Sequence, residues 1–181
     1  MTQITGKTGL TGLLGSPVAH SISPLMHNYS FQALDLDYVY LCFDVKEQGL
    51  KAAVEGLRAL NVRGFNLTMP DKNRVLEYLD DLSCAARLIG AVNTVYEDHG
   101  QMVGENTDGK GFIKSLEDEQ IKITGKKAVI LGAGGAARAI AVELALAGAQ
   151  KIIIVNRFRH SVHTLIFFKK MDCTKYGSVT V

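Results

Sequence analysis

Residues 127–157 of this chain read KAVILGAGGAARAIAVELALAGAQKIIIVNR, and their pattern decides the fold. The apolar run 128–131 predicts a strand that is buried on both faces, as strands of parallel sheets are. A helical pattern follows from residue 136 to about residue 146, and Gly148 ends it. A second apolar run, 151–155, completes a strand, turn, helix and strand of about 30 residues, the length typical of a βαβ unit.

Small residues occupy the turn of this unit at the spacing G-x-G-x-x-G/A, namely Gly132, Gly134 and Ala137. Gly132 permits a tight turn, Gly134 lets a diphosphate approach the backbone, and Ala137 leaves room for the helix to pack on the strand. The helix N-terminus directs N–H groups and a positive dipole end at the same turn. The pattern therefore predicts a dinucleotide site, and the alternative is a glycine-rich turn in an ordinary α/β domain.

The residues after the second strand indicate which dinucleotide is bound. A site for NAD usually places Asp or Glu about 20 residues past the glycines, where it accepts a hydrogen bond from the ribose. This chain has Asn156 and Arg157 there, with Arg159 just beyond. A guanidinium group suits a 2′-phosphate and offers nothing to a bare hydroxyl, so the sequence favours NADP over NAD.

The composition is that of an ordinary globular protein, with 181 residues, 47% hydrophobic residues and a net charge of +2. This charge gives no sign of a surface for nucleic acid or membrane lipids. There is no secretory leader and no apolar run of about 18 residues, so we expect a cytoplasmic protein that does not span a membrane. The cysteines have no paired spacing, and no Cys/His cluster has the spacing of a metal site.

The first half of the chain also alternates strands with helices, which predicts a second α/β unit ahead of the dinucleotide unit. In it, Ser23 reads as the N-cap and Pro24 as the first residue of a helix that follows a strand at 11–15. Ser21 lies in the same loop, and we expect it to cap nothing. Two hydroxyl groups beside a helix start are suited to binding a polyol.

Further polar residues follow a strand predicted at 63–69, where α/β sheets place their ligand sites. They are Asn66, Thr68 and Lys72, and a helix is predicted after them at 73–79. A short helix is expected after Ser83 and a hairpin with its turn at 98–100. Asn93 and Asp108 lie beside the strands of this hairpin.

Five separate motifs in a fixed order carry a resemblance to a known family. The chain resembles the shikimate/quinate dehydrogenases over residues 8–157. The motifs are SISPLMHN (21–28), NLTMPDK (66–72), GAVNT (90–94), NTDG (106–109) and GAGGAARA followed by VNR (132–157). The resemblance implies an α/β protein with a three-layer N-terminal domain that binds a hydroxylated cyclohexene acid, followed by the start of a Rossmann domain that binds NAD(P).

The resemblance also implies the roles of single residues. Lys72 and Asp108 would form a catalytic pair that supplies a proton to the alkoxide left by hydride transfer, and either of the two could hold that proton. Ser21 and Ser23 would bind the substrate carboxylate. The ring hydroxyls would be bound by Asn66, Thr68, Lys72, Asn93 and Asp108. The cofactor would be bound by Gly132, Ala133, Gly134, Gly135, Ala136, Asn156, Arg157 and Arg159.

The predicted domains are a substrate domain at 1–104, a connecting helix and junction at 105–126, and a partial Rossmann domain at 127–181. A complete dinucleotide domain has about six strands. Residues 158–181 do not continue its pattern, so we expect a truncated chain. Two strands without their neighbours would expose apolar surface and favour self-association, as a homodimer or in another form.

Three functions fit this reading. The first is NADP-dependent reduction of 3-dehydroshikimate to shikimate, a step of aromatic amino acid biosynthesis. NLTMPDK also fits the branch of the family that accepts quinate and NAD, and a truncated chain could bind ligand or a partner chain without catalysis. A folate dehydrogenase with the same cofactor unit is disfavoured by the combination of Ser21, Thr68, Lys72 and Asp108.

Overall fold

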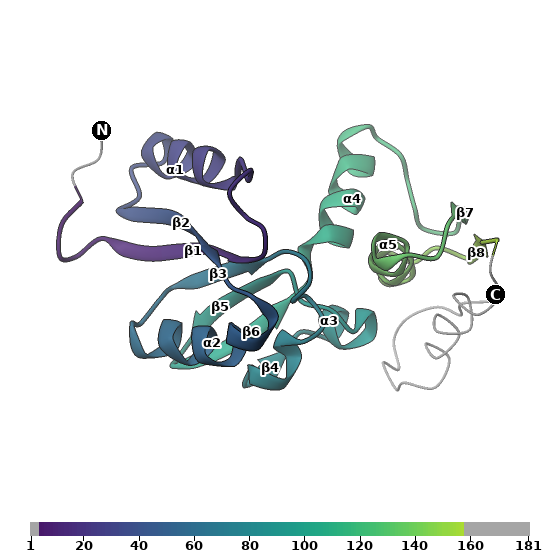
Figure 1. The fold of residues 1–181 in the computed structure, drawn as a ribbon. Helices are drawn as coiled ribbons and strands as arrows, with labels where there is room; N and C mark the ends of the chain where they lie inside the picture. Colours follow the sequence, from purple (N-terminus) through teal and green to yellow (C-terminus); the bar gives the residue numbers. More distant parts are fainter. Residues whose placement is uncertain (1–3, 158–181) are drawn as a thin grey trace. The chain divides into compact units, whose positions relative to one another are not determined.

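The computed structural model describes residues 4–157, which form two compact units (Figure 1). The first unit takes the chain up to Ser83 together with residues 90–105. The second takes residues 84–89 together with residues 106–157. The first unit is therefore built from two separate stretches of sequence.

The first unit is organised around a six-stranded mixed sheet with the strand order β2-β1-β3-β5-β6-β4. Strand β1 pairs in parallel with β2 and β3, while β5 runs antiparallel to both β3 and β6. The strands are β1 (Gly9–Gly15), β2 (Tyr38–Asp44), β3 (Gly64–Leu67), β4 (Asp81–Leu82), β5 (Thr94–Asp98) and β6 (Gln101–Glu105). The carboxyl ends of β1 and β3 and the amino end of β5 consequently share one edge of the sheet.

Helices lie on both sides of this sheet, with α1 (Ser23–Ala33) on one side and α2 (Leu50–Ala59) on the other (Figure 1). Helix α2 follows a 3-10 turn, η1 (Glu47–Gly49), and buries one apolar face made of Leu50, Val54 and Leu57. This helical spacing of apolar residues is the reason that the segment folds as a helix over the core. The three-layer α/β arrangement that the sequence predicts is confirmed.

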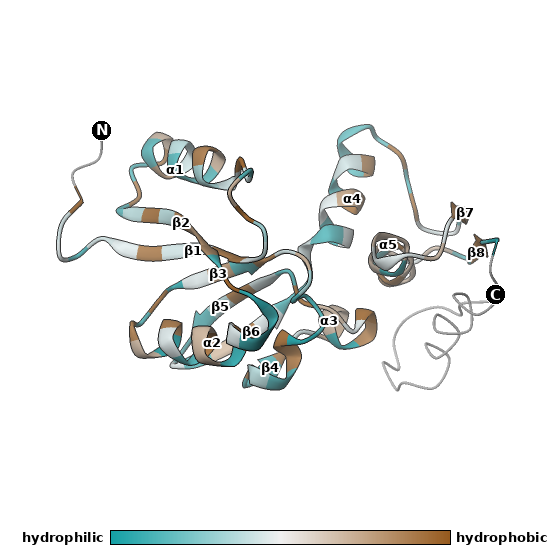
Figure 2. Ribbon diagram, in the orientation of Figure 1, coloured by the Kyte–Doolittle hydropathy of each residue, from teal (hydrophilic) through white to brown (hydrophobic). Residues whose placement is uncertain are grey.

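Helix α1 is unusual because none of its residues is fully buried and none is charged. Its hydrophobic residues are visible as brown bands in Figure 2, and the side chains of Leu25 and Tyr29 are 77% and 73% exposed. The helix rests on the sheet through aromatic rings. The ring of His27 stacks on that of Tyr40 with their centroids 4.2 Å apart, and Phe31 packs on the same cluster.

The second unit contains the predicted βαβ unit, with β7 (Lys127–Leu131), α5 (Gly135–Leu146) and β8 (Lys151–Val155). The two strands are parallel and in register from Lys127 opposite Lys151. Helix α5 covers one face of the pair, and its core includes Leu144 and Ile152. Gly148 has a φ of +83°, a left-handed conformation that favours glycine directly after a helix.

The prediction that residues 128–131 are buried on both faces is wrong for one face of the strand. Val129 and Leu131 on β7 are 60% and 82% exposed, and Val155 opposite Leu131 is 52% exposed. A parallel sheet needs a layer on each side to bury its strands fully. The side of β7 and β8 away from α5 is an open apolar face, and we refer to Val129, Leu131 and Val155 as the open face.

Two local predictions are also corrected. The N-cap of α1 is Ile22, and Ser23 is the first helical residue. Residues 73–79 do not form an α-helix, because turns lead into a single 3-10 turn, η2 (Val75–Tyr78). In contrast, α3 (Cys84–Ile89) and the hairpin of β5 and β6 occur where they were predicted.

Helix α4 (Thr107–Asp118) packs against α5 at a glycine. A Cβ atom at Gly109 would lie 2.5 Å from the carbonyl oxygen of Ala139, a backbone atom that cannot move aside. Gly111 in the same helix would meet nothing within 4 Å. The close approach of the two helices therefore requires a glycine at position 109 but not at position 111.

We expect Gly109→Ala to lower the free energy of unfolding by about 1–3 kcal/mol or more, because the added methyl group must push the helices apart. Gly111→Ala, in the same helix, is the control. It should leave stability unchanged or raise it by about 0.5–1 kcal/mol, since alanine favours helix. Urea unfolding measures both variants, and equal stabilities for the two would contradict the packing role of Gly109.

No helix within residues 4–157 is both long and apolar enough to cross a bilayer. In the same part of the chain, no three His, Cys, Asp or Glu side chains are grouped as a metal ion would require. Neither Cys42 nor Cys84 is part of a disulfide.

Candidate active site

Two loops of the first unit lie together at the sheet edge shared by β1 and β3. The amide of Ser16 donates to the carbonyl of Met69 over 3.3 Å, and the amide of Thr68 donates to the carbonyl of Leu14 over 2.9 Å. A Cβ atom at Gly15 would lie 2.3 Å from the methyl carbon of Thr68. The two loops therefore approach each other more closely than a residue larger than glycine would permit at position 15. The loop that carries the serines is thereby tied to the loop that carries Thr68.

Ser21 and Ser23 lie at the start of α1. The Oγ of Ser21 accepts a hydrogen bond from the amide of Ser23 over 3.2 Å. Ser21 thus interacts with the helix start, a role that the sequence analysis gave to Ser23. Both side chains are partly exposed, and no acidic residue stands in the first turn of α1. A helix start with two hydroxyl groups and no carboxylate favours an anionic ligand.

Asn66 on β3 lies at the centre of a polar network. Its Oδ1 accepts from the phenol of Tyr40 over 2.9 Å. Its Nδ2 donates to the carbonyl of Asn93 over 3.2 Å and to the Oγ1 of Thr94 over 3.0 Å. The Oγ1 of Thr94 donates in turn to the Oδ1 of Asn93 over 3.0 Å. Both amide hydrogens of Asn66 are therefore engaged inside the protein.

Lys72 lies in the turn after β3 and is partly buried. Its carbonyl oxygen accepts a hydrogen bond from the amide of Val92 over 2.7 Å. The next residue, Asn93, donates its own amide to the carbonyl of Glu105 over 3.1 Å. The backbone of Lys72 is thus attached to the segment that carries Asn93, at the same edge of the sheet as Thr68.

The residue before Lys72 is a buried acid. Asp71 has no exposed surface, and neither of its carboxylate oxygens has a hydrogen-bond partner among the described residues. Burial raises the pKa of Asp71 above its ordinary value of 3.8, because a carboxylate loses its hydration there. The folded state therefore holds a proton on Asp71 at pH values where the unfolded chain has released it.

Because the pKa of Asp71 is raised in the folded state, we expect Asp71→Asn to stabilise the fold. As the pH rises from 3.8 through the raised pKa of the folded state, the free energy of unfolding falls by up to about 1.4 kcal/mol per pH unit. The asparagine variant does not titrate, so its advantage in free energy of unfolding should grow over that window and then stay constant. Urea titrations between pH 4 and 8 measure it.

Asp37→Asn, an exposed acid in the loop before β2, is the control. A surface substitution of this kind should change stability by no more than about 0.5 kcal/mol. A stability difference for Asp71→Asn that does not vary with pH would show that titration of Asp71 is not its cause.

In the second unit, Asp108 lies in the first turn of α4. Asn106 is the N-cap of this helix, and its Oδ1 accepts from the amide of Asp108 over 3.1 Å. Asn106 is almost fully buried, whereas Asp108 is exposed. The cap fixes where the helix begins, and with it the direction in which Asp108 leaves the backbone.

The glycine turn between β7 and α5 has the features of a phosphate site. Gly132 has a φ of +108°, and its amide donates to the carbonyl of Val155 over 2.7 Å. Gly134 is the N-cap of α5. A Cβ atom at Gly132, Gly134 or Gly135 would meet nothing within 4 Å, so the space over the turn is open. Ala133 is partly buried and Ala136 exposed.

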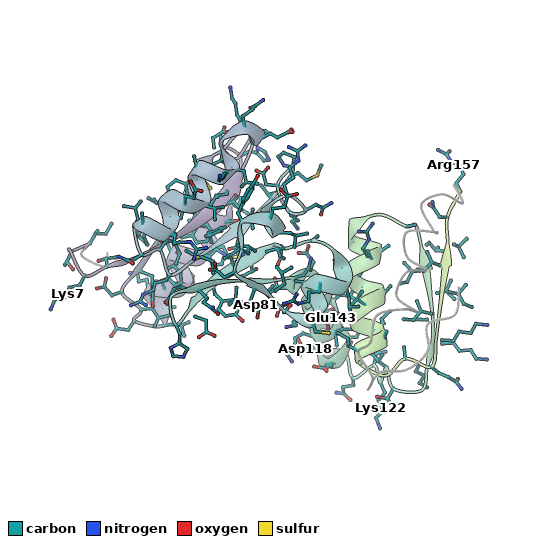
Figure 3. The ribbon with its side chains drawn as sticks, turned by 90° about the horizontal axis from the view of Figure 1, so that it is seen from below. Lys7, Asp81, Asp118, Lys122, Glu143 and Arg157 are labelled. Carbon is teal, nitrogen blue, oxygen red and sulfur yellow. The ribbon has the colours of Figure 1, made fainter. Side chains whose placement is uncertain are left out.

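Asn156 and Arg157 follow β8 directly, and Figure 3 shows the side chain of Arg157 at the end of that strand. Because β7 and β8 are parallel, these residues emerge at the same edge as the glycine turn. Arg159, the third predicted ribose ligand, lies outside the described residues.

The predicted site residues thus fall into two groups. One edge of the first unit holds Ser21, Ser23, Asn66, Thr68, Lys72 and Asn93, whereas Asp108 and the glycine turn belong to the second unit. Sequence reasoning missed Tyr40 and Thr94, since no spacing rule links Tyr40 to a residue 26 positions away. It also missed Asn106 as an N-cap, although Asn two residues before Asp is a recognisable capping signal.

Comparison with known families assigns both halves of the chain. Residues 13–95 match the shikimate dehydrogenase substrate binding domain, and residues 115–177 match the shikimate / quinate 5-dehydrogenase domain. The second match extends past Arg157, where the sequence analysis expects the resemblance to end.

Curated relatives give the same assignment. The chain is 56% identical over 155 residues to the shikimate dehydrogenase (NADP(+)) of Alkaliphilus metalliredigens, covering 86% of this chain and 54% of the relative. It therefore spans about half the length of the curated relatives it matches.

Among solved structures, shikimate 5-dehydrogenase from Listeria monocytogenes in complex with shikimate and NAD matches with a TM-score of 0.89 and 45% identity, covering 99% of this chain and 63% of the other. The ligand-free 5-ketofructose reductase of Gluconobacter sp. strain CHM43 matches with a TM-score of 0.87 and 45% identity, covering 98% and 64%.

Proposed function

The chain belongs to the shikimate/quinate dehydrogenase family, and we propose that it acts in the NADP-dependent, reversible reduction of 3-dehydroshikimate to shikimate, a step of aromatic amino acid biosynthesis. The observation that carries this proposal is the gathering of polar residues from three distant motifs at one sheet edge, where Ser21, Thr68 and Asn93 lie on connected loops. We further propose a cytoplasmic location, a substrate domain at 1–104, a junction at 105–126 and a partial Rossmann domain from 127.

Lys72 is the proposed acid/base of this reaction, with Asp108 as its partner and as a ligand of the substrate. Hydride delivered to the ring ketone leaves an alkoxide, which must receive a proton from a group within hydrogen-bond reach. The half-buried position of Lys72 beside the segment of Asn93 supports this role. Asp108 lies in the helix that is capped by Asn106, and this cap fixes the position of its backbone.

The substrate carboxylate is assigned to Ser21 and Ser23, and the ring hydroxyls to Thr68, Lys72, Asn93 and Asp108. The uncharged, dipole-bearing start of α1 supports the first assignment. We propose that Asn66 supports these ligands from behind, since both of its amide hydrogens are engaged within the protein.

The cofactor is assigned to the turn of Gly132, Ala133, Gly134, Gly135 and Ala136, with Asn156, Arg157 and Arg159 at the adenosine ribose. The open space over the turn and the N-terminus of α5 support diphosphate binding. An arginine at the end of β8 favours the 2′-phosphate of NADP. NAD remains the alternative, because the Listeria structure holds that cofactor.

The experiment that tests the proposal follows the absorbance of reduced nicotinamide with shikimate or quinate and NADP or NAD, in all four combinations. A fifth reaction with 5-ketofructose and NADPH is included because of the Gluconobacter neighbour. We expect the fastest turnover with shikimate and NADP. No turnover by folded protein, with shikimate still bound, would support the alternative of a chain that binds ligand without catalysis.

We propose that two copies of the chain associate through the open face of β7 and β8. This surface is apolar and lies on parallel strands, which are normally covered on both sides. Leu131→Lys should shift the protein toward monomer, because a charge at the centre of an apolar contact must be desolvated.

Analytical ultracentrifugation over a range of protein concentrations measures this shift. The control is Ile121→Lys, which changes an isoleucine of the second unit that is 51% exposed and lies outside the sheet. If Leu131→Lys and the unchanged protein show the same distribution of monomer and dimer, the open face is not the contact.

A further inference from the structure

Tyr40 is a buried tyrosine that no motif of the family singles out. It lies on β2, is 2% exposed, and its ring stacks against that of His27 on α1. Strand β1 separates it from β3, yet its phenol reaches across to Asn66. A hydrogen bond that spans an intervening strand needs a long side chain held at a fixed angle, and the stacked ring of His27 provides that restraint.

The hydrogen bonds from Tyr40 onward all run in one direction. The phenol can only donate to the Oδ1 of Asn66, because that oxygen has no hydrogen to give. The amide group of Asn66 is thereby oriented with Nδ2 toward β5, where it donates to the carbonyl of Asn93 and the Oγ1 of Thr94. The hydroxyl of Thr94 then directs its own hydrogen to the Oδ1 of Asn93.

The orientation of Asn93 is the end point of this chain of bonds. Asparagine oxygen and nitrogen have nearly the same size, so the neighbouring hydrogen bonds decide which of them faces a ligand. Thr94 holds the Oδ1 of Asn93 by donating to it, and the bond that Thr94 accepts from Asn66 keeps its hydroxyl hydrogen pointed away from Asn66. Burial raises the pKa of Tyr40, so its phenol stays a donor across the physiological pH range.

We propose that Tyr40 is a positioning residue that, through Asn66 and Thr94, sets the side-chain orientation in which Asn93 meets a hydroxylated substrate. Asn66 belongs to the same relay and does not donate to the substrate itself. The inference rests on the proposed function for the identity of the ligand, although the relay can be observed without any ligand. We call Tyr40, Asn66, Thr94 and Asn93 the amide relay.

The test compares Tyr40→Phe with Thr11→Val. The first variant removes only the phenol oxygen. The second removes a hydroxyl from β1, where Thr11 donates to the carbonyl of Val39 over 2.9 Å on the same face of the sheet. Each loses one partly buried hydrogen bond, so the two should lose similar stability, but only the first interrupts the amide relay.

Nuclear magnetic resonance of the side-chain amides is the first readout. In Tyr40→Phe we expect the signals of Asn66 and Asn93 to shift and their hydrogens to exchange faster, while Thr11→Val leaves them in place. The second readout is the dissociation constant for shikimate, expected to rise between about twofold and tenfold in Tyr40→Phe alone. Thr94→Val should repeat the effect, and Thr94→Ser, which keeps the hydroxyl, should restore the affinity.

Unchanged amide signals of Asn93 in Tyr40→Phe would overturn the proposal, as would an equal loss of shikimate affinity in Thr11→Val. Absence of shikimate binding by the unchanged chain would instead count against the proposed function. In that case the amide signals of the two variants still decide whether the relay exists.

Discussion

Replacing Lys72 with alanine is expected to lower kcat for shikimate oxidation by about 10²–10⁴-fold, the range that general acid–base groups contribute. The substitution removes the group that we propose to exchange a proton with the substrate oxygen. The fold should persist, because alanine retains the backbone bond from the amide of Val92 to the carbonyl of residue 72, which helps to hold this turn.

Steady-state rates with NADP measure the loss, and thermal unfolding verifies the fold. Lys51→Ala is the matched control, since Lys51 lies on the exposed face of α2 in the same unit and pairs only weakly with Glu55 over 3.8 Å. A folded Lys72→Ala protein with normal turnover would exclude Lys72 as the acid/base.

The second large effect is expected at Gly134, where stability and binding should change in different ways. Gly134 has the extended backbone of an N-cap, with a φ of −81° and a ψ of −173°, so other residues fit there without strain. Asp is a favoured N-cap, and Gly134→Asp should therefore keep or slightly raise the stability of α5. The same carboxylate would repel the cofactor diphosphate, and like charges in contact cost several kcal/mol, or about 100-fold or more in affinity.

Calorimetric titration with NADP and thermal unfolding separate these two effects. Gly134→Ser is the control, because serine also caps the helix but carries no charge, and it should lose far less affinity than Gly134→Asp. Equal NADP affinity in Gly134→Asp and the unchanged protein would show that the cofactor diphosphate does not bind at this turn.

Sequence patterns predicted the elements whose determinants are local. The βαβ unit, the turn at Gly132 and the hairpin of β5 and β6 follow from apolar periodicity and glycine positions within short windows. The sequence also predicted that polar residues of the first unit gather at one edge of its sheet, because parallel strands bring their carboxyl ends to one edge. That edge is where Thr68 and the serine loop meet.

Features that depend on distant partners were not predicted. The bond from Tyr40 to Asn66 and the close approach of Gly109 to Ala139 join segments whose spacing in sequence carries no signal. The burial of β7 was overestimated. An apolar run shows that a strand is suited to burial, but it does not show whether another layer of the protein covers the strand. The start of α1 was predicted one residue too late, since proline fits the second helical position as well as the first.

The division of the first unit into two stretches has a consequence for synthesis on the ribosome. Residues 84–89 fold with the second unit, where α3 buries Ala85, Ala86 and Ile89, and the guanidinium of Arg138 on α5 holds the carbonyl of Ile89 over 3.1 Å. The sheet of the first unit cannot be completed until β5 and β6 have left the exit tunnel, by which time α3 is already exposed without its partner. During synthesis α3 therefore leaves the ribosome before α5, the helix that it packs against, and a gene cut after residue 105 would leave α3 without α5 altogether.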